Sequence, residues 1–332
     1  MMLDYLFIDI GDISKGSARI YGRNISRILK EYGFLADFIL FDNIGDVDFS
    51  VLPKSRFVLL GKGMPNVGKG VFSHTSLRLG RLHPDLNKAG HWSSDYDFFI
   101  VGSVSERLAV LNKAAVSVIL VPQIEFLSGG HYLDNFMCDT RGIASSTAKI
   151  LWHGDSGHLF NFPSDLIDAL NDFGNKIEFV VVTNKKVGIK GLHVEPRFVN
   201  YSEENLLNEL TDTRVGLVTS VNRINTARDF ISNRGRQKQK GDIIVRYKWN
   251  SNPARAFLFV QHGINFLCDI NPEHYIFNRG IKPPLCDGFK AWRDKLQECI
   301  EGRVIQDFDD IFKRYHDYSE LIDLMKDESD RT

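Results

Sequence analysis

KWNSNPARAFLFVQHGINFLCDINPEHYIFNRG, residues 248–280, is the stretch that most constrains the fold. Its apolar residues give one helical face: Ala256, Phe257, Phe259 and Val260. Gly263 is placed to end this helix, and the apolar run 264–268 predicts a short buried strand. Asn271 and Pro272 then predict the start of a second helix. The loop 269–273 is therefore expected at the carboxyl end of a strand, where open α/β sheets bind ligands.

Polar residues lie just before the helix of this stretch. Lys248, Asn252 and Arg255 precede or occupy its first turn. Backbone N–H groups at a helix N-terminus attract anions, and cationic side chains strengthen that attraction. We therefore expect this part of the chain to bind a ligand that carries phosphate.

Length and composition place the chain among globular proteins of about two domains. It has 332 residues, of which 43% are hydrophobic and 25% are charged, and its formal net charge is −1. This charge argues against bulk nucleic-acid binding. The four cysteines show no C-x-x-C spacing, which favours buried reduced thiols over a disulfide framework or a zinc site. No apolar run approaches the roughly 20 residues of a membrane span, and no signal peptide is apparent, so we expect a cytoplasmic protein.

The first part of the chain alternates strands and helices. Residues 4–10 are almost continuously apolar, as in a strand buried on both faces, and the helix that follows is expected to end at Gly33. Strands are predicted at 4–10, 35–41, 56–60, 97–101 and 116–121, and a second helix at 103–113. Residues 1–124 are thus predicted to form one doubly wound domain.

A polar, glycine- and serine-containing segment at 125–148 is the predicted linker. A second α/β domain is predicted at 149–290. Its expected elements are strands at 149–152, 177–183 and 215–218, a helix at 163–173 and a helix that Ser202 caps. The remaining segment, 291–332, is predicted to be helical.

Three motifs suggest other chemistry. Gly63-x-x-x-x-Gly68-Lys69 follows a predicted strand as a P-loop does, but Gly70 stands where Ser or Thr would hold magnesium. Asn66 replaces the third glycine of a dinucleotide fingerprint. His153 and His158 flank Asp155, yet no further ligand is spaced for a metal. We therefore expect no metal site.

The basic run 228–248 is either a solvated loop or a clamp on a phosphate or an anionic membrane acceptor.

The order of these parts resembles the GT-B class of nucleotide-sugar glycosyltransferases. The resemblance is carried by GSARIYGRNISRILKEYGF (16–34), DYDFFIVGSVSERLAVLNKAAVSVILVPQIE (95–125), KILWHGD (149–155), VNYSEENLLNELTDTRVGLVTS (199–220) and the stretch 248–280. The Glu-x7-Glu pair of many retaining members is absent, because its positions carry about Asn250 and Leu258. The chain is thus similar to a divergent member of that class.

The resemblance implies two Rossmann-like domains facing a cleft, with C-terminal helices crossing back. It implies transfer of a sugar from a nucleotide-sugar donor, without a metal or other cofactor, to a glycan or lipid-linked acceptor of bacterial-type surface polysaccharide synthesis. Peripheral contact with the inner face of the membrane would follow. The donor would be held by His153, Gly154, Asp155, Lys248, Asn252, Arg255, Asp269 and Glu273.

The acceptor would be held in the first domain by the loop containing Gly16, Ser17 and Arg19, and its hydroxyl deprotonated by Asp12 or His91. Two alternatives remain open from the sequence. One is a nucleotide-sugar 2-epimerase of the same fold, and the other is a non-catalytic subunit that binds the sugar nucleotide without turnover.

Overall fold

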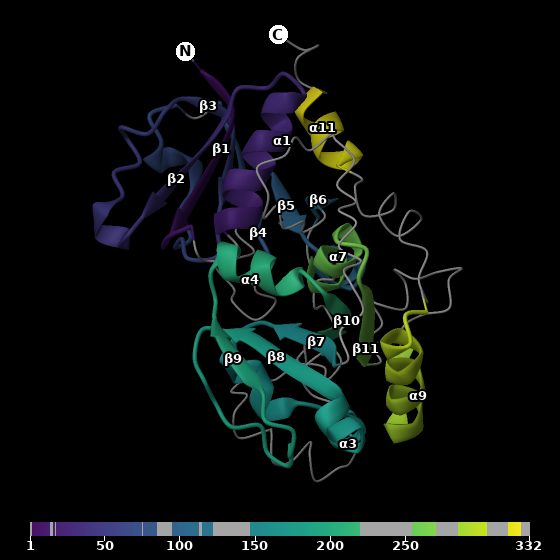
Figure 1. The fold of residues 1–332 in the computed structure, drawn as a ribbon. Helices are drawn as coiled ribbons and strands as arrows, with labels where there is room; N and C mark the ends of the chain where they lie inside the picture. The colour runs from purple at the N-terminus through teal and green to yellow at the C-terminus, as the bar shows by residue number, and fades with distance from the viewer. Residues whose placement is uncertain are drawn as a thin grey trace. The chain divides into compact units, whose positions relative to one another are not determined.

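The computed structural model describes residues 2–13, 16, 18–74, 76–84, 95–112, 115–121, 147–219, 254–269, 285–303 and 318–326. The chain forms two compact units, one of residues 1–135 with 316–332 and the other of residues 136–315. Each unit is built on a six-stranded parallel sheet (Figure 1). The fold is therefore two Rossmann-like α/β domains, as the sequence predicts.

Unit 1 has the strand order β2-β1-β3-β4-β5-β6, and every neighbouring pair is parallel. Its strands are β1 (Leu3–Ile10), β2 (Ala36–Phe41), β3 (Ser55–Leu60), β4 (Arg78–Leu82), β5 (Phe98–Val101) and β6 (Ser117–Leu120). Its helices are the π-helix η1 (Ala18–Asn24), α1 (Ile25–Glu31), α2 (Val104–Leu111), α11 (Ser319–Lys326) and the short 3-10 turns η2 (Ile44–Asp46) and η3 (Lys69–Val71).

The five strands predicted for this unit are all present, and the sixth, β4, was not predicted. β4 has the sequence RLGRL. Because two of its five residues are arginine, its sequence does not show the apolar pattern of a buried strand. Arg81 is fully buried, and its guanidinium donates to the carbonyl oxygens of Met64 (2.7 Å) and Pro65 (3.0 Å). These two hydrogen bonds reduce the cost of burying the cation. Gly80 lies against Phe98, whose ring leaves no room for a Cβ there.

Two helices of unit 1 begin or end at capping residues, of which Gly33 was predicted from the sequence. Ser103 accepts a hydrogen bond from the backbone N–H of Glu106 at 3.2 Å and so caps α2. Gly33, which follows α1, has a φ of 88° that suits glycine. At the other end of the chain, Glu320 of α11 accepts from Arg107 of α2 at 2.6 Å and from the backbone N–H of Leu120 at 3.1 Å. The last described helix thus belongs to unit 1, to which the chain crosses back.

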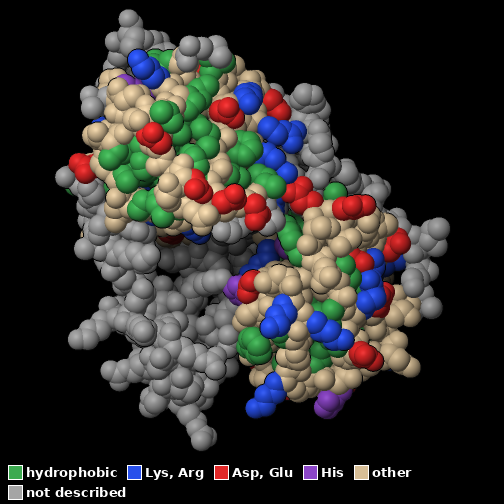
Figure 2. All heavy atoms as spheres, turned by 90° about the vertical axis from the view of Figure 1, so that its left-hand side faces the viewer, with side chains coloured by type: hydrophobic (Ala, Val, Ile, Leu, Met, Phe, Trp, Pro, Cys, Tyr) green, Lys and Arg blue, Asp and Glu red, His purple; other side chains and the backbone are tan. Residues whose placement is uncertain are grey.

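The edge strand β2 borders an apolar surface of unit 1. Figure 2 shows hydrophobic side chains gathered on this unit with acidic side chains along their border. The exposed apolar residues near β2 are Tyr32, Leu35, Ile44 and Val51. Asp37, Asp42, Asp46 and Asp48 lie in the same part of the chain and are exposed. Charges beside an edge strand discourage pairing with another sheet.

Unit 2 has the strand order β12-β11-β10-β7-β8-β9, again with parallel neighbours. Its strands are β7 (Ala148–His153), β8 (Ile177–Thr183), β9 (Arg197–Asn200), β10 (Thr213–Val218), β11 (Asn265–Asp269) and β12 (Leu285–Cys286). Its helices are η5 (Ser156–Asn161), α3 (Ser164–Phe173), η6 (Gly174–Lys176), α4 (Glu203–Leu210), α7 (Ala254–Gln261) and α9 (Gly288–Ile300).

The stretch 248–280 contributes α7 and β11, as predicted. Phe259 of α7 packs on Gly216 of β10, where an added Cβ would lie 2.3 Å from the phenyl ring. Gly263 has a φ of 61° and ends the helix. Ser202 caps α4 by accepting from the backbone N–H of Asn205 at 3.0 Å. The helix predicted to start at Asn271 lies outside the described residues.

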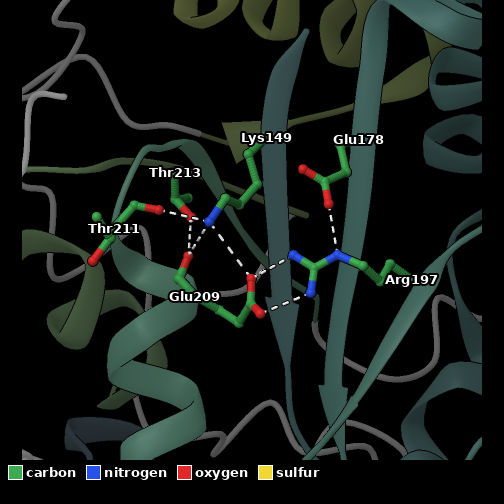
Figure 3. A network of polar contacts seen from close by, with 6 residues as sticks. All are labelled: Lys149, Glu178, Arg197, Glu209, Thr211 and Thr213. Carbon is green, nitrogen blue, oxygen red and sulfur yellow. Dashed lines mark hydrogen bonds and ion pairs between the residues drawn. The ribbon is translucent and has the colours of Figure 1, made fainter. Parts of the chain in front are cut away.

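A charged network closes the amino edge of the unit 2 sheet (Figure 3). Arg197 donates from Nη1 and Nη2 to the two carboxylate oxygens of Glu209 (2.8 and 2.6 Å) and from Nε to Glu178 (2.6 Å). Lys149 donates to the carbonyl oxygens of Glu209 (3.1 Å) and Thr211 (2.6 Å). The hydrogen bonds of these groups are made within the network. The network lies at the amino ends of the strands, whereas such sheets bind ligands at the carboxyl ends. We assign this network to stability.

The thiols of Cys268, Cys286 and Cys299 are free and buried, as predicted, and Cys138 lies outside the described residues. Burial raises the pKa of Cys286 and of Cys299 to about 12. Within the part of the chain that the structure describes, no helix is long and apolar enough to cross a membrane.

Candidate functional site

The strand order of unit 2 reverses between β7 and β10. From β7 the chain proceeds outward through β8 and β9, and from β10 it proceeds the other way through β11 and β12. Loops on either side of such a reversal diverge and leave a crevice at the carboxyl ends of the strands, where α/β sheets bind ligands. The described candidate donor residues lie at or just after the ends of β7 and β11 and in the first turn of α7, which places them at this edge.

The loop after β7 is a tightly built turn. Asp155 caps η5 by accepting from the backbone N–H of Gly157 at 2.8 Å. Its other oxygen accepts from the amide of Asn184 at 3.0 Å, and Asn184 in turn accepts from the backbone N–H of Ser156 at 2.9 Å. Asn184, which follows β8, therefore fixes the loop that follows β7. The carboxylate of Asp155 is occupied by this turn in the structure.

Gly154 lies where a side chain does not fit without adjustment. A Cβ built on it would be 3.0 Å from the indole ring of Trp152 and 3.3 Å from Nη1 of Arg255. Glycine at such a point lets the backbone and a cation approach closely. The neighbouring His153 is buried, and its ring lies edge-on to Phe259 with centroids 5.6 Å apart.

Arg255 connects the carboxyl ends of β7 and β10, the two strands between which the strand order reverses. It lies in the first turn of α7, and its guanidinium donates to the carbonyl oxygens of His153 (Nη1, 3.5 Å) and Thr219 (Nη2, 3.3 Å). These residues end β7 and follow β10, respectively. Thr219 also accepts from the indole N–H of Trp152 through its hydroxyl at 3.0 Å. The two strand ends and the start of α7 thus meet at one guanidinium.

The electrostatics of Arg255 are set by burial. Burial lowers the pKa of its guanidinium, and the carboxylate of Asp269, at the end of β11, acts in the opposite direction. The pKa of an arginine is so high that the group stays charged at neutral pH. Among the described residues, two of its five N–H groups are engaged, by the carbonyl oxygens above, which leaves three to bind an anion.

The structure therefore brings together four of the predicted donor-site residues around one edge: His153, Gly154, Arg255 and Asp269. Asp155 lies one residue further, in the turn. Lys248, Asn252 and Glu273 are outside the described residues. Sequence reasoning missed Trp152, Asn184 and Thr219. The last two are polar residues directly after buried strands, which is the signal that could have found them.

The acceptor-side residues lie at the carboxyl edge of the unit 1 sheet. Asp12 is exposed in the loop after β1, and Gly16 is half-buried. Arg19 is buried in η1 and donates from Nη1 to the carbonyl oxygen of Ile13 at 3.4 Å. Ser17 and His91 lie outside the described residues.

The glycine-rich loop after β3 is held in place by its own unit. Lys69 pairs with Asp97 at 2.7 Å, and the backbone N–H of Gly63 donates to Asp9 at 2.8 Å. In a P-loop the equivalent lysine and N–H groups contact phosphate. Both groups have protein partners here, which argues against the P-loop alternative. In the described parts of the chain, no three His, Cys, Asp or Glu side chains gather as metal ligands would.

Comparison by sequence finds no matching family model and no significantly similar curated protein. Comparison by structure finds the same fold in glycosyltransferases. Sucrose-phosphate synthase from Thermosynechococcus elongatus aligns with a TM-score of 0.58 and 10% identity over 99% of this chain and 98% of that one. HepE from Anabaena, solved with UDP and glucose, aligns with a TM-score of 0.54 and 10% identity over 99% of each chain.

The DNA-modifying enzyme β-glucosyltransferase is a third neighbour. It was solved with and without uridine diphosphoglucose, and it aligns with a TM-score of 0.52 and 13% identity over 97% of this chain and 99% of that one. At these identities the likeness shows the fold. The chain has the GT-B fold of these glycosyltransferases, with low sequence identity to each of them.

Proposed function

We propose that this chain is a glycosyltransferase that uses a nucleotide-sugar donor, bound at the carboxyl edge of unit 2. The observation that carries the proposal is Arg255, which joins the ends of β7 and β10 beside a glycine and, among the described residues, uses only two of its five N–H groups in hydrogen bonds. The presence of UDP or UDP-glucose in two structural neighbours of the same fold supports this choice of ligand.

The proposed chemistry follows from the charges at this edge. When the bond between the sugar and the nucleotide breaks, negative charge develops on the leaving diphosphate. Arg255 and the N–H groups at the start of α7 would stabilise that charge without a metal ion. Lys248 and Asn252 would contribute from the segment before α7, and Asp269 and Glu273 would bind ribose or sugar hydroxyls.

The acceptor would lie at unit 1. Asp12 is exposed at the carboxyl edge and would deprotonate the acceptor hydroxyl if the reaction inverts, with His91 as the other candidate base. Gly16, Ser17 and Arg19 would shape the acceptor loop. We further propose a glycan or lipid-linked glycan as acceptor, in bacterial-type surface polysaccharide synthesis, and a cytoplasmic protein that contacts the inner face of the membrane.

A thermal-shift panel with UDP, GDP, CMP, ADP, ATP with magnesium, and NAD tests the proposal. A ligand at about 100 times its Kd adds about 2.7 kcal/mol of stability if it binds only the folded chain. Stabilisation by one nucleoside mono- or diphosphate supports the proposal and names the donor for an activity screen. No shift with any nucleotide, for a chain that melts cooperatively, contradicts it.

The activity screen separates the alternatives. The matching nucleotide-sugar is incubated with and without mixed glycan and lipid-linked acceptors, and the products are resolved by chromatography. Acceptor-dependent release of the nucleotide indicates transfer. Conversion of the donor to a second nucleotide-sugar without acceptor indicates the 2-epimerase, and binding without turnover indicates the non-catalytic subunit.

A further inference from the structure

A chain of three buried polar side chains in unit 1 plays no part in the proposed chemistry. The imidazole Nδ1 of His83 lies 2.7 Å from the carboxylate of Glu106, and its Nε2 lies 2.8 Å from the hydroxyl of Tyr21. The side chains of His83 and Glu106 are 9% and 14% exposed, and Tyr21 is 1% exposed. Glu106 also accepts from the backbone N–H of Gly102 at 3.1 Å.

The hydrogen bonds define one arrangement of protons. A carboxylate only accepts, so Nδ1 of His83 carries the proton that it donates to Glu106. Nε2 of the neutral ring then accepts from the Tyr21 hydroxyl. Burial lowers the pKa of His83, which keeps the ring neutral near pH 7. Tyr21 therefore donates to His83, and His83 donates to Glu106, in one directed chain.

The backbone around this chain is unusual at both ends. His83 follows β4 with a φ of 45°, in the left-handed region that is strained for a non-glycine residue. Its backbone N–H donates to the carbonyl oxygen of Ile100 at 2.8 Å, which holds it there. Tyr21 lies in the π-helix η1, a form that is rare and often found at functional sites. Strained backbone of this kind persists where the surroundings fix it, and it points to function.

Topology places this arrangement beside a second ligand position. The strand order of unit 1 reverses between β1 and β3, so the loops after these strands diverge at the carboxyl edge. Residues 11–13 follow β1, and Arg19 of η1 is bonded to the carbonyl oxygen of Ile13 among them. His83 directly follows β4, and Glu106 lies in α2, which follows β5 of the same sheet. They can therefore fix η1, and through it the loop, from outside.

We propose that Tyr21, His83 and Glu106 form a positioning relay that fixes η1, and with it the described residues 11–13 after β1, in the geometry that holds the acceptor hydroxyl. The acceptor role of the loop rests on the proposed function, whereas the mechanical role of the relay does not. None of the three side chains needs to touch the substrate. Removing one link should loosen the loop and weaken acceptor binding, with donor binding in unit 2 unchanged.

Hydrogen–deuterium exchange of the full chain, read by mass spectrometry, tests the relay. His83→Gln and Tyr21→Phe should each raise exchange in peptides covering 11–24 by about tenfold or more, the effect of losing a buried hydrogen bond to a polar or charged partner. The control is His74→Gln. His74 Nε2 lies 2.7 Å from the carbonyl oxygen of Ser55, at the amino edge of the same sheet. That variant should leave exchange in 11–24 unchanged.

Glu106 offers a rescue test. Glu106→Gln keeps a carbonyl oxygen that can accept from Nδ1 and should retain most protection of 11–24, whereas Glu106→Ala should lose it. With an acceptor from the activity screen, His83→Gln should raise the acceptor KM and leave the donor KM unchanged. A loss of fold without a local change would raise exchange everywhere, including α4.

Two results distinguish a failure of the relay from a failure of the proposed function. Wild-type-like exchange at 11–24 in a folded His83→Gln or Tyr21→Phe variant overturns the relay. A wild-type chain that binds no nucleotide, with local loosening still seen in the variants, overturns the proposed function and the acceptor role of the loop. Tyr21→Phe removes a single oxygen atom and keeps the experiment decisive if the histidine variant does not fold.

Discussion

Replacing Arg255 with methionine should weaken nucleotide binding while leaving unit 2 folded. Methionine replaces the aliphatic stem of arginine and carries no charge, so the variant removes the guanidinium and keeps the packing of the stem. In the structure this group makes two long hydrogen bonds, at 3.3 and 3.5 Å, to backbone carbonyl oxygens. Their loss should cost about 1 kcal/mol of stability, since long hydrogen bonds contribute little net free energy.

The effect on binding should be larger. A hydrogen bond between a cation and a phosphate contributes about 1.5–3 kcal/mol, so the variant should bind UDP about 10- to 150-fold more weakly if UDP is the nucleotide that the panel identifies. Uridine lacks the diphosphate, and its affinity should change by less than about threefold. The comparison of UDP with uridine therefore isolates the contact between Arg255 and the phosphates.

Isothermal titration calorimetry measures both affinities, and Arg293→Met is the matched control. Arg293 lies on α9 of the same unit and pairs with Asp172 at 2.7 Å, with both side chains exposed. That variant should bind UDP as the wild type does. The reasoning is refuted if Arg255→Met binds UDP normally, or if uridine and UDP lose affinity by the same factor.

Three further predictions concern the scaffold. Arg197 lowers the pKa of Glu209 through its hydrogen bonds, so the stabilisation is present above the unfolded pKa of about 4.3 and is lost as pH falls through the lower folded value. Glu209→Gln should therefore cost about 1 kcal/mol at pH 7 and close to nothing at pH 3 by urea denaturation; an equal cost at both pH values would contradict the ion pair. In a Cys138→Ser variant, the three buried thiols should not react with Ellman's reagent at pH 8 until denaturant is added, because burial raises their pKa values. Gly216→Ala places a Cβ 2.3 Å from the ring of Phe259 and should cost about 1–3 kcal/mol, read as a lower Tm; an unchanged Tm would show that the ring moves freely.

The sequence predicts strands well where they are buried on both faces. β1 and β8 are almost continuously apolar, as expected of strands that other elements cover on both faces of a sheet. β4 could not be found in this way, because the partners that make a buried Arg81 acceptable are carbonyl oxygens 16 and 17 residues earlier in the chain. β9 is short, half exposed and at the edge of its sheet, so its pattern is weak.

The place of the candidate site could be predicted from the sequence, but the contacts between its residues could not. The rule that ligands bind at the carboxyl ends of parallel strands points to the residues after β7 and β11. It does not reveal that Arg255 meets Thr219, which is 36 residues away, or that Asn184 fixes the turn at Asp155. The relay of Tyr21, His83 and Glu106 depends on three elements far apart in sequence, and only the folded chain brings them together.

Hydrogen–deuterium exchange of the wild-type chain with and without the nucleotide from the panel shows where the nucleotide binds. We expect added protection at the carboxyl edge of unit 2, in peptides covering 153–157 and 254–257. We expect no change at the amino edge, in peptides covering 197–200 and 209–213, where the charged network of Figure 3 lies. Protection confined to unit 1 or to the amino edge of unit 2 would contradict the proposed donor site, as would saturating nucleotide without any added protection.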